Sequence, residues 1–238
     1  MNTKKLHQLF LKYNSVSTDT RTIKKNDLYF ALKGALFNGN KFASTALTKG
    51  AKFAIIDEKK YAINANYILV DNVLTTLQEL AKFHRNHLNL KIIALTGSNG
   101  RTTTKELINC VLQKKYKTVA TKGNLNNHIG VPLTLLSMDK TTEIGIVEMG
   151  ANHIKEIEFL CKIATPNYGY ITNFGKAHLE GFGGYKGVIK GKSQLYTFLK
   201  NSNGKVFVNT NDALQVKQSP GINLCTSLRW AIGTSSGL

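Results

Sequence analysis

The sequence predicts an α/β protein with two units, a small mixed unit followed by a larger one built on a mainly parallel sheet. Three observations lead to this fold class. Short continuous apolar runs, typical of strands buried on both faces, alternate with stretches whose apolar residues recur at helical spacing. One of these runs ends in a glycine-rich turn that opens a helix. With 238 residues, 42% of them hydrophobic, the chain can bury the core of one or two domains.

The first unit extends to about residue 71. Leu6, Leu9 and Phe10 form a short helical face, and turn residues such as "GALFNGN" separate the strands. The expected strands are "DLYFAL" (27–32), "AKFAIID" (51–57) and "NYILV" (66–70). Apolar residues then recur at helical spacing from Val73 to His84, which predicts a connecting helix over 73–88.

From residue 91 strands and helices alternate, so we expect a domain boundary near residue 90. The expected strands are "KIIAL" (91–95), "EIGIVEM" (143–149) and "YGYITN" (168–173). The helices that follow them are expected at about 102–114, 154–162 and 186–199. The sequence shows no internal repeat and no low-complexity tract.

The formal net charge of +18 raises the question of a nucleic-acid partner. Arginine occurs only at Arg21, Arg85, Arg101 and Arg229, so lysine supplies the rest of the 32 basic residues. Lysine and asparagine both have AT-rich codons, so genomic base composition would give the same bias. The lysines are scattered, and no aromatic RNA-binding pattern is present. We therefore expect no nucleic-acid partner.

The chain carries no sign of a membrane or secreted protein. Its basic amino terminus lacks the apolar block of a signal peptide, and no apolar run reaches the roughly 18 residues of a membrane span. Cys110, Cys161 and Cys225 share no metal-ligand spacing, and their odd number favours reduced thiols. We expect a cytoplasmic monomer.

The stretch "GSNGRTT" (97–103) has the features of a loop that binds phosphate. Gly97 and Gly100 allow a tight turn, and the helix that follows presents unpaired N–H groups to an anion. The hydroxyl of Thr102 stands where a phosphate loop binds Mg²⁺. Arg101 replaces the usual lysine, however, and Leu95 replaces a glycine of the general pattern. On the loop alone, a structural glycine turn remains an alternative.

The wider sequence resembles the Mur ligase family, ATP-dependent enzymes of peptidoglycan synthesis. The matching motifs run in the family's order: "STDTRTIKKNDLYFALKG" (17–34), "ALTGSNGRTTTKE" (94–106), "GNLNNHIGVPLTLL" (123–136), "VEMGANHIKEI" (147–157), "ITNFGKAHLEGFG" (171–183) and "GVIKGKSQLY" (187–196). The resemblance is closest to members that join D-alanyl-D-alanine to a UDP-N-acetylmuramoyl tripeptide. It implies a small α/β substrate-binding domain with its linker helix (1–88), then an incomplete P-loop, ATP-binding domain (89–238).

The resemblance also implies a reaction and a set of catalytic residues. ATP would phosphorylate the peptide carboxylate, and the amine of D-alanyl-D-alanine would attack the acyl phosphate. Residues of the loop would hold the nucleotide: Gly97, Ser98, Asn99, Gly100, Arg101, Thr102 and Thr103. Thr102 and Glu148 would hold one Mg²⁺, and His178 with a carbamylated Lys192 would hold a second. Lys192 is preferred to Lys190 because its spacing to Tyr196 matches the family.

For the UDP-sugar substrate, the resemblance points to Asp19, Thr20 and Arg21 and to a second contact loop, "KGALFNGNKF" (33–42). Asn124, Asn126 and Asn127 would contact the muramoyl end. Asparagine runs are also common in ordinary turns.

Several positions depart from the family pattern. Arg101 is longer and planar where a compact ammonium is usual, so we expect phosphate binding to survive and phosphoryl transfer to be impaired. Gln194, His128 and Asn38 each change a charge near the expected site.

The end of the chain departs further. After "VFVNTNDALQ" (206–215) the family would continue with the rest of the nucleotide domain and a third, dipeptide-binding domain, but "SPGINLCTSLRWAIGTSSGL" (219–238) matches neither. We expect a truncated or frameshifted chain, inactive as a ligase alone. The alternatives are a catalytically inactive fragment that still binds nucleotide or UDP-muramoyl peptide, or another Mur ligase, which "EMGANH" and "HLEGFG" disfavour.

Overall fold

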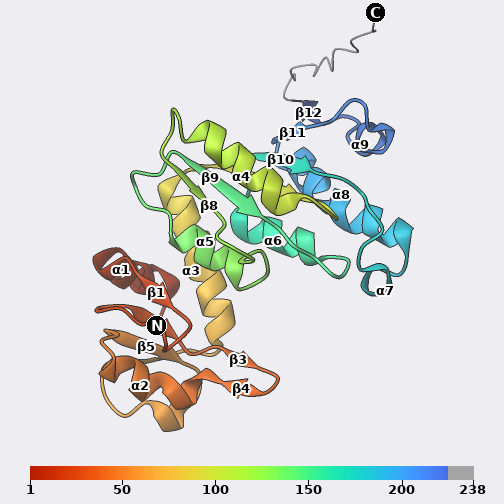
Figure 1. Ribbon diagram of the computed structural model, residues 1–238. Helices are drawn as coiled ribbons and strands as arrows, with labels where there is room; N and C mark the ends of the chain where they lie inside the picture. Colours follow the sequence, from red (N-terminus) through yellow and green to blue (C-terminus); the bar gives the residue numbers. More distant parts are fainter. Residues whose placement is uncertain (225–238) are drawn as a thin grey trace, which may run out of the picture.

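A computed structural model describes residues 1–224, which form two lobes joined by a long helix (Figure 1). Cys225, Arg229 and most of the unmatched closing segment lie outside the described residues. The predicted α/β class with parallel sheets is confirmed. In the part of the chain described, no helix is long and apolar enough to cross a membrane.

The small lobe holds a four-stranded sheet in the order β1-β2-β5-β6, with every neighbouring pair parallel. Its strands are β1 (Val16–Ser17), β2 (Leu28–Phe30), β5 (Phe53–Ile56) and β6 (Tyr67–Leu69), and its helices are α1 (Thr3–Tyr13) and α2 (Ala43–Thr48). A hairpin of β3 (Lys33–Gly34) and β4 (Phe37–Asn38) leads into the 3-10 helix η1 (Gly39–Phe42), and η2 (Lys59–Tyr61) follows β5.

Side chains on the two faces of this sheet belong to different clusters because neighbouring strand residues point in opposite directions. Leu28 and Phe30 belong to the main core, together with α1 and α3 residues. Tyr29 belongs to a second cluster with Ala43 and Ala46 of α2. The sheet is therefore covered on both faces.

Helix α3 (Val73–Leu88) connects the lobes over the range that the sequence predicts. Asn72 caps its start by accepting a hydrogen bond from the Thr75 amide, and Asn89 ends it in the left-handed conformation. Its buried face, which includes Leu77 and Leu80, joins a core cluster that continues into both lobes.

Arg85 ties the end of this helix to the large lobe. Its guanidinium is buried and donates to three oxygens at the end of α6: the carbonyls of Ala164 and Thr165 and the Oδ1 of Asn167. The same Asn167 oxygen accepts the amide of Ile92 in the first strand of the large lobe. Burial lowers the pKa of Arg85.

The large lobe holds a six-stranded sheet in the order β12-β11-β10-β7-β9-β8, and every neighbouring pair is parallel. Its strands are β7 (Lys91–Thr96), β8 (Thr118–Ala120), β9 (Ile144–Glu148), β10 (Tyr168–Ile171), β11 (Lys205–Phe207) and β12 (Asn223–Leu224). Its helices are α4 (Arg101–Leu112), α5 (Gly130–Leu136), α6 (Glu156–Ala164), α7 (Leu179–Phe182), α8 (Tyr185–Asn201) and α9 (Ala213–Gln218).

Strand β7 lies where the direction of chain winding reverses. After β7 the chain crosses to β8 on one side through α4, and it later reaches β10 on the other side through α6. Ligands of open α/β sheets bind outside the carboxyl ends of the strands at such a reversal. The glycine-rich loop follows β7 at that position.

Candidate active site

The loop after β7 needs glycine at both of its ends. Gly97 has a φ of 144°, and a Cβ added there would lie 2.0 Å from the Thr172 hydroxyl oxygen. Gly100 has a φ of 73° and stands at the start of α4, where no side chain caps the helix. The first amides of α4 thus remain free of a side-chain cap, and a helix start of this kind binds anions.

Residues that follow β10 hold this loop in shape. The Asn99 carbonyl accepts from the Thr172 hydroxyl (2.7 Å) and from the Asn173 side-chain amide (3.0 Å), while the Asn173 Oδ1 accepts from the Asn99 amide (3.1 Å). Ser98 donates its hydroxyl to the Gly175 carbonyl (2.8 Å). Sequence reasoning missed these anchors, although "ITNFG" contains them.

Glu148 ends β9 beside the loop, and its side chain is only 1% exposed. One carboxylate oxygen accepts from the Thr102 hydroxyl (3.1 Å), and the other accepts from the Asn126 amide (2.8 Å). The backbone amide of Glu148 donates to the Thr121 hydroxyl (3.0 Å). Three of the predicted site residues, Thr102, Asn126 and Glu148, therefore meet at one point.

Arg101 lies across the mouth of the loop. Its Nη1 donates to the Gly97 carbonyl (2.9 Å), and its Nε lies 3.4 Å from a Glu148 carboxylate oxygen. Thr103, by contrast, is exposed on α4.

Lys192 is buried in α8, with 1% of its surface exposed, whereas Lys190 is exposed. Its Nζ donates to the Ala151 carbonyl (3.2 Å) and lies 5.2 Å from the centre of the Phe182 ring. Burial, helped by the charge of Arg101 and opposed by Glu156, lowers the pKa of Lys192 to about 8. Among residues 1–224 no carboxylate forms an ion pair with Lys192, and a buried amine with a lowered pKa is chemically suited to a reaction with an electrophile.

His178 stands apart from this group. It is exposed, adopts a φ of 54° directly before α7, and within residues 1–224 makes no side-chain hydrogen bond or ion pair to Glu148 or Lys192. The structure thus places it on a loop near α7 and α8 without bringing it to the other predicted metal ligands.

Lys105 is a site-adjacent residue that sequence reasoning missed. It is fully buried one turn into α4, and its Nζ donates to the Thr121 carbonyl (2.6 Å) and pairs with Glu106 (2.7 Å). Thr121 in turn accepts from the Glu148 amide. Lys105 therefore fixes the end of β8 against the helix that begins at the loop.

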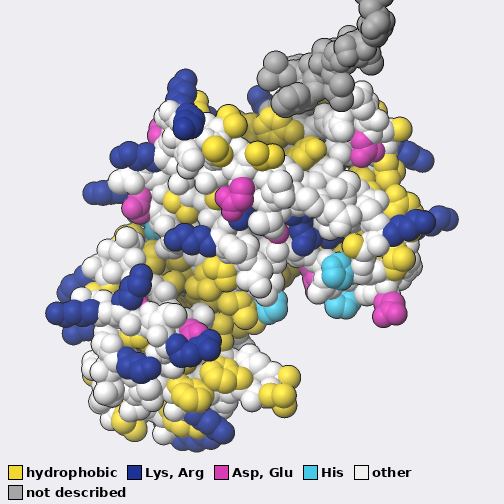
Figure 2. Space-filling view, viewed as in Figure 1, with side chains coloured by type: hydrophobic (Ala, Val, Ile, Leu, Met, Phe, Trp, Pro, Cys, Tyr) yellow, Lys and Arg dark blue, Asp and Glu magenta, His cyan; other side chains and the backbone are white. Residues whose placement is uncertain are grey.

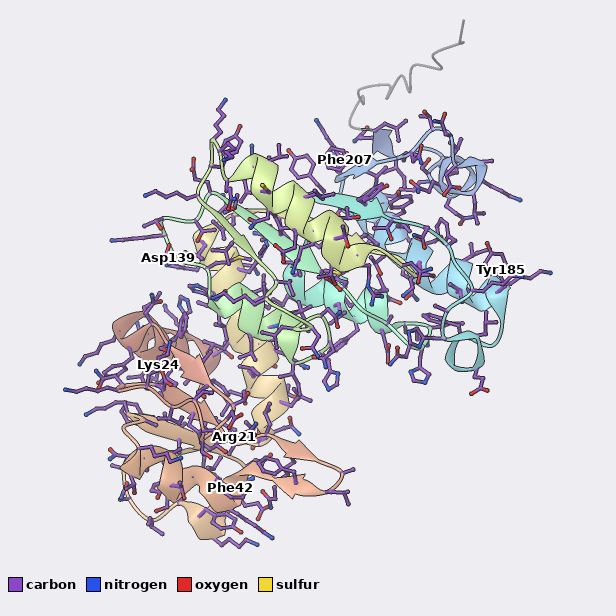
Figure 3. The ribbon with its side chains drawn as sticks, viewed as in Figure 1. Arg21, Lys24, Phe42, Asp139, Tyr185 and Phe207 are labelled. Carbon is purple, nitrogen blue, oxygen red and sulfur yellow. The ribbon has the colours of Figure 1, made fainter. Side chains whose placement is uncertain are left out.

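The predicted UDP-sugar residues lie in the small lobe, where Figure 3 labels Arg21. The Asp19 carboxylate accepts from Arg21 at 3.0 Å (Nε) and 2.6 Å (Nη2), and these hydrogen bonds lower the pKa of Asp19 to about 2. Arg21 remains 86% exposed. The Thr20 carbonyl accepts from Lys49 (3.0 Å).

The second predicted contact loop is the β3–β4 hairpin with η1. The rings of Phe37 and Phe42 stack with their centres 5.3 Å apart, and both are partly exposed. Asn38 donates to Glu58 (2.8 Å) and accepts from the Asn40 amide (3.0 Å). An aspartate at this position would repel Glu58, so the departure at Asn38 suits its neighbour.

Of the remaining predicted asparagines, Asn127 lies just before α5 and accepts from the amides of Ile129 and Gly130, while Asn124 is exposed. The departure at Gln194 also has a structural role. Its Oε1 accepts from the amides of Lys155 and Glu158 at the start of α6 (3.1 and 3.3 Å).

A hollow of about 380 Å³ lies beside the contact of α3 with α6, and hydrophobic side chains gather between the two lobes in Figure 2. Its lining comes from α3, from α6 and its approach, and from the loop before α5: Leu74, Gln78, His128, Ile154, Lys155, Glu156 and Phe159.

The family profiles match most of the chain. The profile described as "Mur ligase middle domain" matches residues 95–227, and "Mur ligase family, catalytic domain" matches residues 12–85. This chain belongs to the Mur ligase family. The predicted resemblance is therefore confirmed.

This Mur ligase chain is similar to several proteins named as UDP-N-acetylmuramoyl-tripeptide–D-alanyl-D-alanine ligases. The UDP-N-acetylmuramoyl-tripeptide–D-alanyl-D-alanine ligase of Bacillus subtilis (strain 168) is 37% identical over 93% of this chain and 48% of its own length. A crystal structure of MurF from Acinetobacter baumannii superimposes with a TM-score of 0.80 at 32% identity, over 94% of this chain and 52% of that one. MurF ligase from Thermotoga maritima, solved in complex with ADP, gives 0.80 at 31% identity, over 90% and 50%. The chain spans about half the length of the curated relatives it matches.

Proposed function

We propose that the chain forms the UDP-sugar-binding (1–88) and ATP-binding (89–238) parts of an ATP-dependent ligase. The ligase joins D-alanyl-D-alanine to UDP-N-acetylmuramoyl tripeptide in the cytoplasm, for peptidoglycan precursor synthesis. The names of the relatives support the substrates. The observation that carries the proposal is the buried Glu148 carboxylate, hydrogen-bonded to Thr102 where α4 begins.

The nucleotide would lie over residues 97–103, where the amides at the start of α4 face its phosphates. The ADP complex of the Thermotoga maritima relative supports this assignment. No group of three His, Cys, Asp or Glu side chains that could hold a metal gathers within residues 1–224. Thr102 and Glu148 still fit Mg²⁺, which is commonly bound by one or two carboxylates together with substrate phosphates and water. The ion would neutralise phosphate charge during transfer.

A test of this site compares Glu148→Gln with Glu143→Gln, which lies just before the opposite end of the same strand. Calorimetry with ADP and Mg²⁺ should show affinity reduced tenfold or more for Glu148→Gln, because among residues 1–224 Glu148 is the acidic residue that contacts the loop, and unchanged affinity for Glu143→Gln. Equal affinities for both variants would place the metal elsewhere.

Lys192, as its carbamate, and His178 would hold a second metal ion. With a pKa of about 8, about one Lys192 in ten is a free amine at pH 7, the form that reacts with CO₂. ¹³C NMR in labelled bicarbonate should show a carbamate signal that Lys192→Arg abolishes and Lys190→Arg leaves in place. A signal that survives Lys192→Arg would assign the modification to another lysine.

For the other substrate, Asp19, Thr20 and Arg21 would bind the UDP end, and Asn124, Asn126 and Asn127 the muramoyl end. The hollow lined by α3, α6 and the loop before α5 offers room for the part that passes from one lobe to the other. Calorimetry with UDP-N-acetylmuramic acid tests the first of these contacts. Arg21→Ala should weaken binding tenfold or more, while Lys24→Ala, an exposed basic residue labelled in Figure 3, should not. Equal binding by the two variants would show that Arg21 is wrongly assigned.

A further inference from the structure

The positive charge beside Glu148 in this structure belongs to the chain itself. Arg101 is the only lysine or arginine within ion-pair distance of this carboxylate among residues 1–224, with its Nε 3.4 Å from Oε1. The carboxylate is almost fully buried, and a buried charge is costly unless a partner of opposite charge or hydrogen bonds compensate it. Arg101 therefore occupies the role that a bound cation would have.

The shape of the guanidinium is what allows this contact. Nη1 donates to the Gly97 carbonyl at 2.9 Å while Nε lies 3.4 Å from a Glu148 oxygen, so one planar group hydrogen-bonds the loop and forms an ion pair with Glu148. A lysine ammonium is a compact point charge on a flexible stem and lacks this forked geometry. The Glu148 oxygen beside Arg101 also accepts from the Asn126 amide, and the other oxygen accepts from Thr102, so both oxygens have partners within the chain.

We propose that Arg101 is an internal counter-ion that closes Glu148 to a free divalent cation, so that metal enters only together with a phosphate-bearing ligand. The phosphate draws the guanidinium away, since arginine binds phosphate through paired hydrogen bonds, and the freed carboxylate then accepts the metal. Metal and nucleotide consequently bind with strong positive cooperativity. The inference rests on the proposed nucleotide site and adds an order of binding to it.

The test uses the full chain and Mn²⁺ as the probe, with free Mn²⁺ followed by electron paramagnetic resonance. Without nucleotide, Arg101→Gln should bind Mn²⁺ at least about tenfold more tightly than the parent. The change removes a positive charge that neutralises Glu148 and repels the metal ion, at a site shielded from water. ADP should then raise the Mn²⁺ affinity of the parent by a larger factor than that of Arg101→Gln, and Mn²⁺ should raise ADP affinity by the same factor.

Two variants control this comparison. Lys114→Gln removes one positive charge roughly 20 Å further along the α4 direction and should bind Mn²⁺ as the parent does. Arg101→Gln combined with Glu148→Gln should lose the gained affinity. If Arg101→Gln does not fold, Arg101→Met, which keeps the aliphatic stem, carries the same expectation.

If the parent and Arg101→Gln bind Mn²⁺ equally well, and this binding depends on Glu148, Arg101 is not a counter-ion that excludes the metal. The proposed metal site would then remain valid. If no variant shows Glu148-dependent Mn²⁺ binding even with ADP, the metal site is wrong and the inference fails with it.

Discussion

Gly97 and Gly100 both have positive φ angles, but a side chain would meet different obstacles at the two positions. At Gly100 an added Cβ has open space, so Gly100→Ala should cost about 1 to 2 kcal/mol of unfolding free energy from backbone strain alone. At Gly97 the Cβ would also collide with Thr172. Overpacking adds roughly 1 to 3 kcal/mol to the strain at Gly97. Urea unfolding of the two variants measures the difference, and equal losses would contradict the role given to Thr172.

At the level of single residues, the sequence predicted those site residues that belong to a local motif. The glycines, Thr102 and Glu148 stand in short patterns at the ends of strands, and the fold brings them together at the reversal point of the sheet. The anchors at Thr172 and Asn173 could not be predicted in this way. They contact Asn99 across a separation of more than seventy residues, and such pairings depend on strand order rather than on local pattern.

Two histidines link α1 to α3 and make the contact between these helices sensitive to pH. His7 Nε2 lies 3.0 Å from His84 Nδ1, and His84 Nε2 lies 2.8 Å from the Met138 carbonyl. Because a carbonyl only accepts, His84 donates from Nε2, and its Nδ1 accepts the proton of neutral His7. Burial, with the nearby His84 and His87, lowers the pKa of His7 to about 4.

The expected consequence is acid destabilisation. A lowered histidine pKa means that the unfolded chain binds more protons, so stability is full above pH 6.5 and falls as the pH approaches 4. Between pH 7.5 and 4.5 the protonation of His7 should lower the free energy of unfolding by about 2 to 3 kcal/mol. Urea unfolding across this range should show a weaker pH dependence for His7→Gln than for the parent. His128→Gln, at an exposed site, should leave the dependence unchanged; an equal slope for His7→Gln would contradict the assignment.

A second expectation at this scale concerns the start of α6. Gln194 accepts from two amides there, so Gln194→Met, which keeps the length of the side chain, should cost about 1 kcal/mol, the usual value of a lost helix cap. Lys190→Met, at an exposed position of α8, the helix that carries Gln194, should cost less than about 0.5 kcal/mol. Thermal unfolding distinguishes them, and equal losses would remove Gln194 from the cap.

Elements with a long apolar period were predictable, and short ones were not. Helix α3 was predicted over its full range because its buried positions recur over sixteen residues. Strand β8 was missed because its three residues are only half-buried at the edge of the sheet, directly after a lysine-rich turn. Helix α5 was missed because seven residues starting with "GVP" give no measurable period. "GALFNGN" was assigned to a turn and contains a hairpin, since two-residue strands leave no alternation to detect.

At the scale of the whole molecule, one core cluster extends through α3 into both lobes. Leu80 lies in it with no exposed surface, so Leu80→Ala should cost about 2 to 5 kcal/mol. The loss should appear in both lobes, because the helix packs against β2 of the small lobe and against α5 and α6 of the large lobe. Hydrogen exchange of β5 and β7 amides measures it. Leu107, on α4, is 63% exposed, so Leu107→Ala should leave the exchange rates of both strands unchanged. Faster exchange confined to one lobe would show that the lobes unfold separately.

The contacts of Arg85 also have a consequence for how the chain is made. Its partner Thr165 lies 80 residues further along the chain, so at roughly 5 to 20 residues per second the ribosome delivers that partner about 4 to 16 s later. At the start of that interval the small lobe already has its four strands, while the far end of α3 lacks both α5 and α6, which pack against it in the folded protein. Helix α5 is synthesised part-way through the interval, so the part of the apolar face that α6 covers stays exposed longest on the nascent chain.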